Sequence, residues 1–343
     1  MRIGITFDLK SSGPSRPGAP DDDQEEFDSP VTIKAVAQVL RDLGHEVTEL
    51  GDGKPLVEAL IANPPDFIFN FAEGHGVGRS REARVPALCE MLNIPYSGSD
   101  PLTLATTLDK DCARRLAASH GITVPRGLVI SGEADLAQVQ GFPLDCYPAI
   151  LKPAWEGSSK GITKRCLVDT PLELTKVARD LARDYTQPIL VEEFIAGDEL
   201  TVGIIGNEKP DIVGIMRILP TEPTDRFVYS LEIKRDWRRL VRYECPAELE
   251  AADRAAVKQA ALKIFNVLGC RDVARIDFRL RKGVPYFLEL NPLPGINPES
   301  SDLVLLAQGM NWSYAQLVGR IFAAACRRNH LSKRCDDRDS LAG

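Results

Sequence analysis

Two stretches of alternating residues near the C-terminal end constrain the fold of this 343-residue chain more than any other segment. From Ala274 to Arg281 apolar and charged residues alternate one by one, and alternation resumes from Val284 to Asn291. Period-two alternation is typical of a strand with one buried face. A three-residue loop over 281–283, with Gly283 at the left-handed position, would join the two strands into an antiparallel hairpin.

The register of this hairpin decides which side chains meet. With the three-residue loop, Arg275 lies opposite Glu289, and one face carries four polar residues: Arg275, Asp277, Glu289 and Asn291. A two-residue loop would place Asp277 and Glu289 on opposite faces. Two carboxylates and an amide oxygen beside an arginine suit Mg²⁺ bridging phosphate oxygens. The segment alone leaves open a plain alternative, an exposed face with ordinary salt bridges.

An α/β pattern occupies the N-terminal third of the chain. Apolar runs predict strands at 2–7, 46–50 and 67–71, with helices at 30–43 and 56–61 between them. Ser29 and Pro30 suit the first helix start, and Gly44 suits its end. This alternation favours a parallel sheet covered by helices, with functional loops at the carboxyl ends of the strands.

The remaining chain mixes further helices and strands. Helices are predicted at 109–120, 173–184, 248–268 and 312–327. Strands are predicted at 128–130, 149–151, 166–168 and 189–194, and a second strand-rich region runs over 200–217 and resumes at Phe227. At roughly 150 residues per domain, the length suggests two or three domains.

Composition excludes several classes of function. The charge of −7 (42 Lys and Arg against 49 Asp and Glu) argues against general nucleic-acid binding. No apolar stretch approaches the roughly 18 residues of a membrane span, and the N-terminus lacks a signal-peptide core. Eight cysteines without a CxxC pair indicate reduced thiols in a cytoplasmic protein, and the four histidines lack ligand spacing. Any metal is therefore expected on oxygen ligands.

Two further segments carry groups that suit a nucleotide. The strand at 149–153 delivers Lys152 to a Gly/Ser-rich loop at 155–161, whose backbone N–H groups and serines suit an anion. The loop lacks the Walker A order, and a plain turn is the alternative. The strand at 189–194 ends in acids and is followed by Glu199, which suits a base and ribose hydroxyls or, alternatively, a solvated sheet edge.

Together these segments resemble the ATP-grasp carboxylate–amine ligases, and within them the D-alanine–D-alanine ligase family. The resemblance spans Phe67 to Arg327 and rests on the joint order and spacing of its motifs. These are Ile94-Pro95-Tyr96-Ser97-Gly98-Ser99, Leu108-Asp109-Lys110, Leu151-Lys152-Pro153-Ala154-Trp155-Glu156-Gly157-Ser158-Ser159, Val191-Glu192-Glu193-Phe194 with Glu199, Ala274-Arg275-Ile276-Asp277 and Leu288-Glu289-Leu290-Asn291-Pro292-Leu293-Pro294-Gly295.

The resemblance implies an α/β (α+β) ATP-grasp fold in three parts. These are an N-terminal Rossmann-like α/β domain (1–106), a central lid domain (107–200) and a C-terminal ATP and catalytic domain (201–330), followed by a charged tail (331–343) that we expect to be disordered. ATP would lie between the last two domains. Family members are commonly homodimers, so a homodimer is possible here, although no sequence feature identifies an interface.

The resemblance also implies roles for individual residues. ATP would contact Lys110, Lys152, Ser159, Glu192, Glu193, Phe194, Glu199 and Lys234. Two Mg²⁺ ions, with Mn²⁺ as an alternative, would bind Asp277, Glu289 and Asn291. Arg275 and the Gly295 N–H would stabilise the tetrahedral intermediate, Ser158 would position the first substrate, and Ser300 would receive the carboxylate of the second.

Three residues mark departures from the family pattern near the first substrate. The family's short first loop is replaced by a long acidic loop, in which Glu25 would hold the substrate ammonium or be solvated. Arg235 follows Lys234 where a tyrosine is usual, and adds a fixed charge. His75 either faces the substrate or lies on the surface.

The implied activity is an ATP- and Mg²⁺-dependent ligase that joins two amino acids through an acyl phosphate. The first choice of reaction is D-Ala plus D-Ala for precursors of the bacterial cell wall (peptidoglycan). A related ligase acting on another amino acid, peptide or natural product is the second choice, and a nucleotide-binding protein that no longer ligates is the third. The expected partners are therefore ATP and small amino acids, with neither nucleic acid nor membrane.

Overall fold

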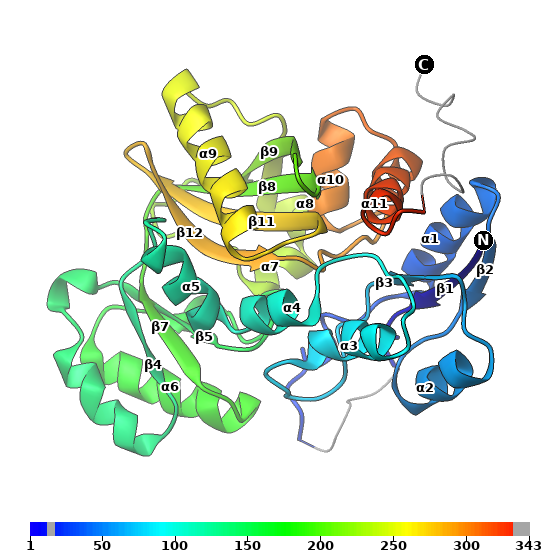
Figure 1. Cartoon of the computed structure of the whole chain (residues 1–343). Coiled ribbons are helices and arrows are strands. Elements are labelled where there is room, and N and C mark those ends of the chain that lie inside the picture. Colours follow the sequence, from blue (N-terminus) through cyan, green and yellow to red (C-terminus); the bar gives the residue numbers. More distant parts are fainter. Residues whose placement is uncertain (12–17, 332–343) are drawn as a thin grey trace.

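The computed structural model describes residues 1–11 and 18–331, which form three β-sheets with flanking helices (Figure 1). Residues 332–343, most of the tail expected to be disordered, lie outside the described residues. No helix within the described part is both long and apolar enough to cross a bilayer. The architecture is mixed α/β, as the sequence predicts.

The N-terminal sheet is parallel and has the order β2-β1-β3. Its strands are β1 (Arg2–Thr6), β2 (Glu46–Glu49) and β3 (Phe67–Asn70), and its helices are α1 (Pro30–Asp42), α2 (Gly53–Ala62) and α3 (Arg84–Met91). The Ser29 side chain caps α1 by accepting a hydrogen bond from the backbone N–H of Thr32. This part confirms the predicted parallel sheet and its helix start.

The central sheet is antiparallel, has the order β4-β7-β5-β6 and carries one long helix, α6. The elements are β4 (Gly127–Ile130), β5 (Ala149–Pro153), β6 (Leu167–Val168), β7 (Ile189–Glu193) and α6 (Pro171–Tyr185), with short 3₁₀ turns at Glu133–Gly141, Leu144–Cys146 and Lys164–Cys166. Apolar side chains of α6 and the sheet form a separate core that includes Leu151, Leu181 and Val191. Two helices precede this sheet, α4 (Pro101–Leu108) and α5 (Lys110–Ser119).

The third sheet has five antiparallel strands in the order β10-β9-β8-β11-β12. They are β8 (Asp198–Gly206), β9 (Asp211–Pro220), β10 (Val241–Glu244), β11 (Asp272–Arg281) and β12 (Val284–Asn291), accompanied by α7 (Leu231–Arg235), α8 (Trp237–Leu240), α9 (Ala251–Val267), α10 (Asp302–Gly309) and α11 (Tyr314–Arg328). Alternate residues of β11 face opposite ways: Ile276 packs in the core beneath α9, and Val273 packs in the core with α10 and α11. Helices therefore cover both faces of this sheet (Figure 1).

The prediction that strands resume at Phe227 is wrong. Residues 227–230 form no strand, and β10 begins only at Val241. Phe227 instead packs in a small apolar cluster with Ile218 and Val241, and its carbonyl oxygen accepts a hydrogen bond from Arg279. In the sequence, an apolar residue that packs against a sheet edge looks the same as the first residue of a strand.

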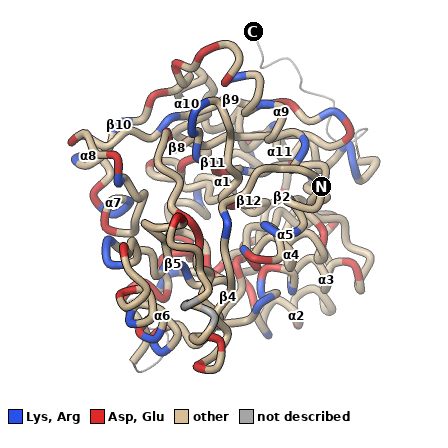
Figure 2. The backbone as a smooth tube through the Cα atoms, turned by 90° about the vertical axis from the view of Figure 1, so that its left-hand side faces the viewer, with Lys and Arg blue, Asp and Glu red and all other residues tan. Residues whose placement is uncertain are grey.

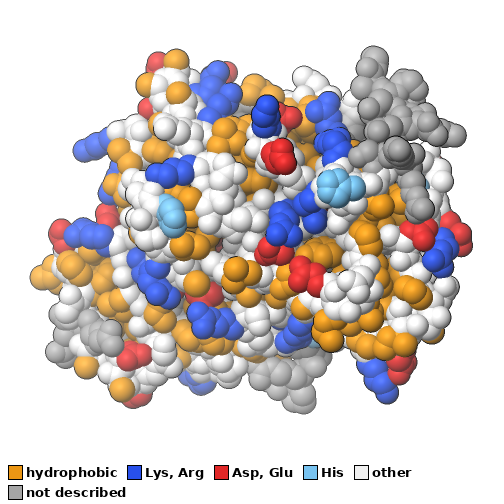
Figure 3. All heavy atoms as spheres, viewed as in Figure 1, with side chains coloured by type: hydrophobic (Ala, Val, Ile, Leu, Met, Phe, Trp, Pro, Cys, Tyr) orange, Lys and Arg blue, Asp and Glu red, His pale blue; other side chains and the backbone are white. Residues whose placement is uncertain are grey.

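Charged residues of both signs are distributed over all parts of the molecule. Lys and Arg intermingle with Asp and Glu along the chain (Figure 2) and over the face shown in Figure 3. Among the described residues on that face, Lys and Arg form no extended basic area of the kind that phosphate-backbone binding requires.

Candidate functional site

The predicted hairpin exists, but with a different loop from the one expected. The turn is the two-residue loop Lys282-Gly283, in which both residues have positive φ (51° and 78°), so the predicted three-residue loop is wrong. A register shift next to Asp277 places one extra residue in β12, so that the side chains of Asp277 and Glu289 lie on the same face of the sheet. Asp277 therefore pairs directly with Glu289, and Arg275 pairs with Asn291 rather than with Glu289.

Charged and polar neighbours surround the two hairpin carboxylates. The Asp277 carboxylate accepts hydrogen bonds from Arg275 at 2.9 Å and from the Thr201 hydroxyl at 2.7 Å. Glu289 lies 3.0 Å from the Lys110 ammonium. Burial raises the pKa of Asp277, whereas the pKa of Glu289 falls well below its usual range because Lys110 and Arg275 outweigh its burial. Glu289 is thus ionised and surrounded by cations.

This set of side chains fits a hard divalent cation. Asp277 and Glu289 are neighbours across the ladder, and the amide of Asn291 lies 3.4 Å from Asp277. All the available donors are oxygens, which Mg²⁺ prefers over nitrogen or sulfur. The assignment of these three residues to Mg²⁺ remains a prediction.

A cleft of about 710 Å³ lies between the central sheet and the five-stranded sheet. Seven of the eight predicted ATP contacts line it: Lys152, Ser159, Glu192, Glu193, Phe194, Glu199 and Lys234. Asp277 and Glu289 line the same cleft. The structure therefore brings together, from three separate motifs, side chains that the family resemblance assigns to ATP binding.

Two buried ion pairs organise the walls of this cleft. The Lys152 ammonium lies 2.6 Å from Glu192, and the Arg279 guanidinium lies 2.5 Å from Glu199. Arg279 also stands 5.3 Å from the ring of Phe194, in a cation–π arrangement. Arg279 is not among the predicted site residues, although it shares the alternating face of β11 with Asp277.

A second cleft, of about 530 Å³, adjoins the first at the hairpin. It contains Lys110, Ser158, Arg275, Asn291 and Gly295 from the predicted set, and Glu289 lines both clefts. The other charged residues that line it are all acidic: Glu26, Glu73, Glu82 and Glu156.

The loop that carries Ser158 adopts an unusual backbone conformation. Ser158 and Ser159 both have positive φ (47° and 59°), which costs free energy for residues with side chains and is concentrated at functional sites. The Ser159 hydroxyl donates to the carbonyl oxygen of Tyr229 at 3.0 Å. The loop is thereby fixed between the two clefts.

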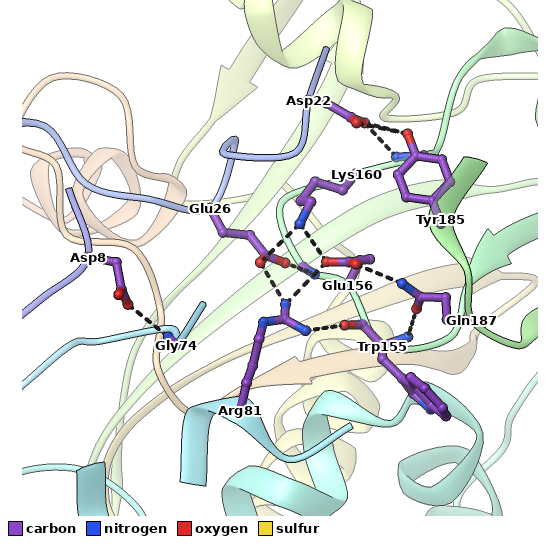
Figure 4. Close-up of polar contacts among 12 residues, drawn as sticks. Asp8, Asp22, Glu26, Gly74, Arg81, Trp155, Glu156, Lys160, Tyr185 and Gln187 are labelled. Carbon is purple, nitrogen blue, oxygen red and sulfur yellow. Dashed lines mark hydrogen bonds and ion pairs between the residues drawn. The ribbon is translucent and has the colours of Figure 1, made fainter. Parts of the chain in front are cut away.

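A network of buried charges holds this loop against the N-terminal region (Figure 4). Arg81 is 2% exposed and donates to Glu26 at 2.6 Å, to Glu156 at 3.2 Å and to the carbonyl oxygen of Trp155 at 2.6 Å. Lys160 lies 2.6 Å from Glu156 and 3.5 Å from Glu26. Although burial opposes ionisation, Arg81 and Lys160 lower the pKa of Glu26 to about 2.

Of the two adjacent acids, Glu26 lines the second cleft, and the role that the family resemblance implies for Glu25 remains a prediction. Glu25 lies outside the second cleft and pairs with Arg235 at 2.8 Å and with Lys10 at 3.6 Å. Arg235 also reaches Asp21 at 3.0 Å, so its guanidinium faces the acidic loop rather than the substrate cleft. The two ion pairs of Arg235 join residues more than 200 positions apart and bring the acidic loop next to α7.

The other two predicted substrate residues also lie away from the hairpin. Ser300 is exposed, and its hydroxyl donates to Asn297 at 3.2 Å. The neighbouring serine, Ser301, lies next to Gly295 of the second cleft. A Cβ atom placed on Gly295 would be 2.9 Å from the Ser301 hydroxyl oxygen. His75 lines a third, outer cavity of about 1040 Å³ that also contains Glu26 and Arg81.

The carboxyl group of Glu82 should make the stability of the folded protein depend on pH. Burial raises the pKa of Glu82 to about 7, with Glu26 adding to the rise and Arg81 opposing it. The folded protein therefore holds a proton that the unfolded chain releases near pH 4.5, so this group makes stability fall as the pH rises from 4.5 to 7. We expect Glu82→Gln to flatten this fall and to increase the urea midpoint above pH 7. Glu208→Gln, in an exposed turn, is the matched control, and identical pH profiles for the two variants would contradict the prediction.

Known sequences that are similar to this chain include ligases and an uncharacterized protein. The family profile described as "D-ala D-ala ligase C-terminus" matches residues 133–323, more than half of the chain. A D-alanine–D-alanine ligase of Aquifex aeolicus is 34% identical over 291 residues, which is 84% of this chain and 93% of that protein. The uncharacterized protein y4sG of Sinorhizobium fredii is 30% identical over 305 residues, 86% of this chain and 87% of that one.

Solved structures share the fold over nearly the whole chain. A D-alanine–D-alanine ligase from Bacillus anthracis complexed with ATP superposes with a TM-score of 0.70 at 22% identity, covering 97% of this chain and 99% of that chain. The VanG D-Ala:D-Ser ligase from Enterococcus faecalis gives a TM-score of 0.69 at 21% identity, covering 94% and 99%.

Proposed function

The chain belongs to the D-alanine–D-alanine ligase family of ATP-grasp enzymes and is an ATP-dependent ligase, and from this premise we propose that it joins the carboxylate of one amino acid to the amine of another. The observation that carries the proposal is the position of Glu289, which lines both clefts. A nucleotide in the first cleft and an amino acid in the second would meet at the hairpin.

The chemistry needs positioned charge rather than a protein nucleophile. One substrate carboxylate attacks the γ-phosphate of ATP, which gives an acyl phosphate and ADP. The amine of the second substrate then attacks the acyl carbon, phosphate leaves, the nitrogen loses a proton and an amide forms. In this proposal Lys110, Lys152 and Lys234 bind phosphate oxygens as point charges.

Asp277, Glu289 and Asn291 would hold the Mg²⁺ ions, which when bound neutralise phosphate charge. Arg275 lies 3.4 Å from Asp302 and 2.9 Å from Asp277, so its guanidinium is fixed from two sides. Together with the backbone N–H of Gly295 in the same cleft, Arg275 would stabilise the oxyanion of the tetrahedral intermediate.

D-Ala plus D-Ala is the first substrate pair to test, because the relatives described above include ligases of that name. The acidic wall of the second cleft favours a second candidate. Glu73 and Glu82 adjoin Glu26 there, and burial raises the pKa of both Glu73 and Glu82. A substrate that carries an additional ammonium group would favour the ionised forms of these carboxyl groups and pair with them, which the side chain of alanine cannot do.

ADP release with a panel of amino acids tests the proposal. The panel contains D- and L-alanine, D- and L-serine, and D- and L-ornithine, singly and in pairs, with the Glu289→Gln variant as the blank. Turnover with D-Ala supports the first candidate, and turnover only with ornithine supports the second. Nucleotide binding without amine-dependent ADP release from any pair would overturn both.

A further inference from the structure

We propose that Asp8, Asp52 and His75 form a binding site for a divalent transition-metal cation, separate from the two ligase clefts. Each residue follows a different strand of the parallel N-terminal sheet. Asp8 comes two residues after β1, Asp52 three residues after β2, and His75 five residues after β3. The carboxyl ends of parallel strands lie at one edge of the sheet, so the topology itself gathers these side chains.

The geometry of the three side chains suits a shared ligand. Each offers one donor atom, and these atoms all lie within 4.8 Å of one another. The His75 Nε2 atom lies 2.9 Å from the Asp8 Oδ1 atom. Donors bound tetrahedrally to one ion at about 2.0–2.2 Å are about 3.3–3.6 Å apart. The His75 and Asp8 donor atoms would therefore separate by about half an ångström to share an ion, which the exposed His75 side chain allows.

Asp8 provides the observation that points to a ligand. The residue is 2% exposed, and its Oδ1 atom makes no hydrogen bond within the described residues. Its other oxygen, Oδ2, accepts a hydrogen bond from the Gly74 N–H at 2.7 Å, which fixes the carboxylate plane (Figure 4). The Oδ1 atom lies 2.9 Å from the His75 Nε2 atom, in an ion pair that lacks hydrogen-bond geometry. Buried polar atoms are normally satisfied, and a cation among Asp8, Asp52 and His75 would satisfy this one.

The charges around the site agree with this explanation. Within residues 1–11 and 18–331, neither Asp8 nor Asp52 forms an ion pair with a lysine or arginine. The one basic group facing them is the imidazole of His75, whose side chain is 59% exposed. Two carboxylates converging on a single imidazole leave net negative charge, which a divalent cation would neutralise.

The donor types select the class of metal. Two carboxylate oxygens and one imidazole nitrogen suit Zn²⁺, with water completing the coordination. Mg²⁺ prefers oxygen donors alone, as in the set Asp277, Glu289 and Asn291. The protein would thus have two cation sites of different selectivity.

A cation at this position would tie together three loops. Asp8 opens the long acidic loop that later carries Glu26, and His75 lies in the loop that leads to Arg81. The Asp28 backbone N–H donates to the Asp8 carbonyl oxygen at 2.8 Å, so the same site adjoins both ends of the acidic loop. The site would therefore support the placement of Glu26 beside the substrate cleft.

Equilibrium dialysis of the full-length protein against Zn²⁺, without ATP or Mg²⁺, tests the proposal. We expect the wild type and Glu289→Gln to bind one more Zn²⁺ per chain than Asp8→Asn or His75→Ala. Zn²⁺ should also increase the melting temperature of the wild type more than that of His75→Ala. The seven described cysteines are unchanged in all variants, so any thiol-bound Zn²⁺ cancels in the difference.

His75→Ala keeps the test decisive, because an exposed side chain can be truncated without unfolding the protein even if Asp8→Asn fails to fold. Equal Zn²⁺ binding by the wild type and His75→Ala would overturn the proposal and leave a simple His75–Asp8 ion pair. Displacement of this Zn²⁺ by an equal concentration of Mg²⁺ would also overturn it.

Discussion

Replacing Glu289 by Gln, or Asp277 by Asn, is expected to lower kcat for ATP-dependent ligation by roughly a hundred- to a thousandfold. Both substitutions keep the shape of the side chain and remove one negative charge from the hairpin. Without that charge, the proposed Mg²⁺ site loses a ligand, and Glu289→Gln also leaves Lys110 without its partner at 3.0 Å. The measurement is ADP release as a function of Mg²⁺ concentration, with the substrates that the amino-acid panel identifies.

Asp211→Asn is the matched control for this prediction. Asp211 is an exposed carboxylate at the start of β9 in the same sheet, and it lines neither cleft. The control should retain the wild-type kcat and Mg²⁺ dependence. If Glu289→Gln and Asp277→Asn both did so as well, the hairpin would not be the metal site.

The second large effect concerns stability and Arg81. Replacing Arg81 by Met should lower the free energy of unfolding by about 3–5 kcal/mol, the usual cost of removing one partner from a buried ion pair. The substitution leaves Glu26 and Glu156 buried with only Lys160 to offset them. Urea unfolding followed by tryptophan fluorescence measures the change.

Two comparisons make the Arg81 result specific. Arg84→Met, on an exposed position three residues further along, removes the same charge and should cost less than about 1 kcal/mol. Adding Glu26→Gln to Arg81→Met should recover part of the loss, because it removes one of the stranded charges. A loss for Arg81→Met no larger than that for Arg84→Met would mean that the network contributes little to folding.

The hairpin shows how far sequence patterns can lead. Alternation predicted both strands and placed Asp277 and Glu289 on one face, and the structure pairs them directly. The same pattern gave the wrong loop length. A β-bulge changes which residues pair across the hairpin, and no particular residue type in the sequence indicates it. The loop was predicted one residue too long and the bulge was not predicted, and these two errors compensated each other in which side chains share a face, although the predicted register was wrong.

The acidic loop shows what local patterns cannot supply. Glu25 and Glu26 are adjacent acids, and the sequence offers no local reason to prefer one. Glu26 turns inward because Arg81, 55 residues away, provides a buried partner at 2.6 Å. Five short helices were also absent from the predictions. The helices α3, α4 and α10 have eight residues each, and α7 and α8 have five and four, so each spans about two turns at most and gives a weak periodic signal.

The division into domains at residues 106 and 200 remains a prediction, but the cores limit how the sheets can move. Residues of α1 and α11 belong to one continuous apolar core, which joins the N-terminal sheet to the five-stranded sheet. Separating these two would expose that core to water, whereas the central sheet has a core of its own. We therefore expect the hinge that opens the ATP cleft to lie where the chain enters the central sheet, next to β4, and where it leaves that sheet, next to β7. The other two sheets should turn together as one rigid body.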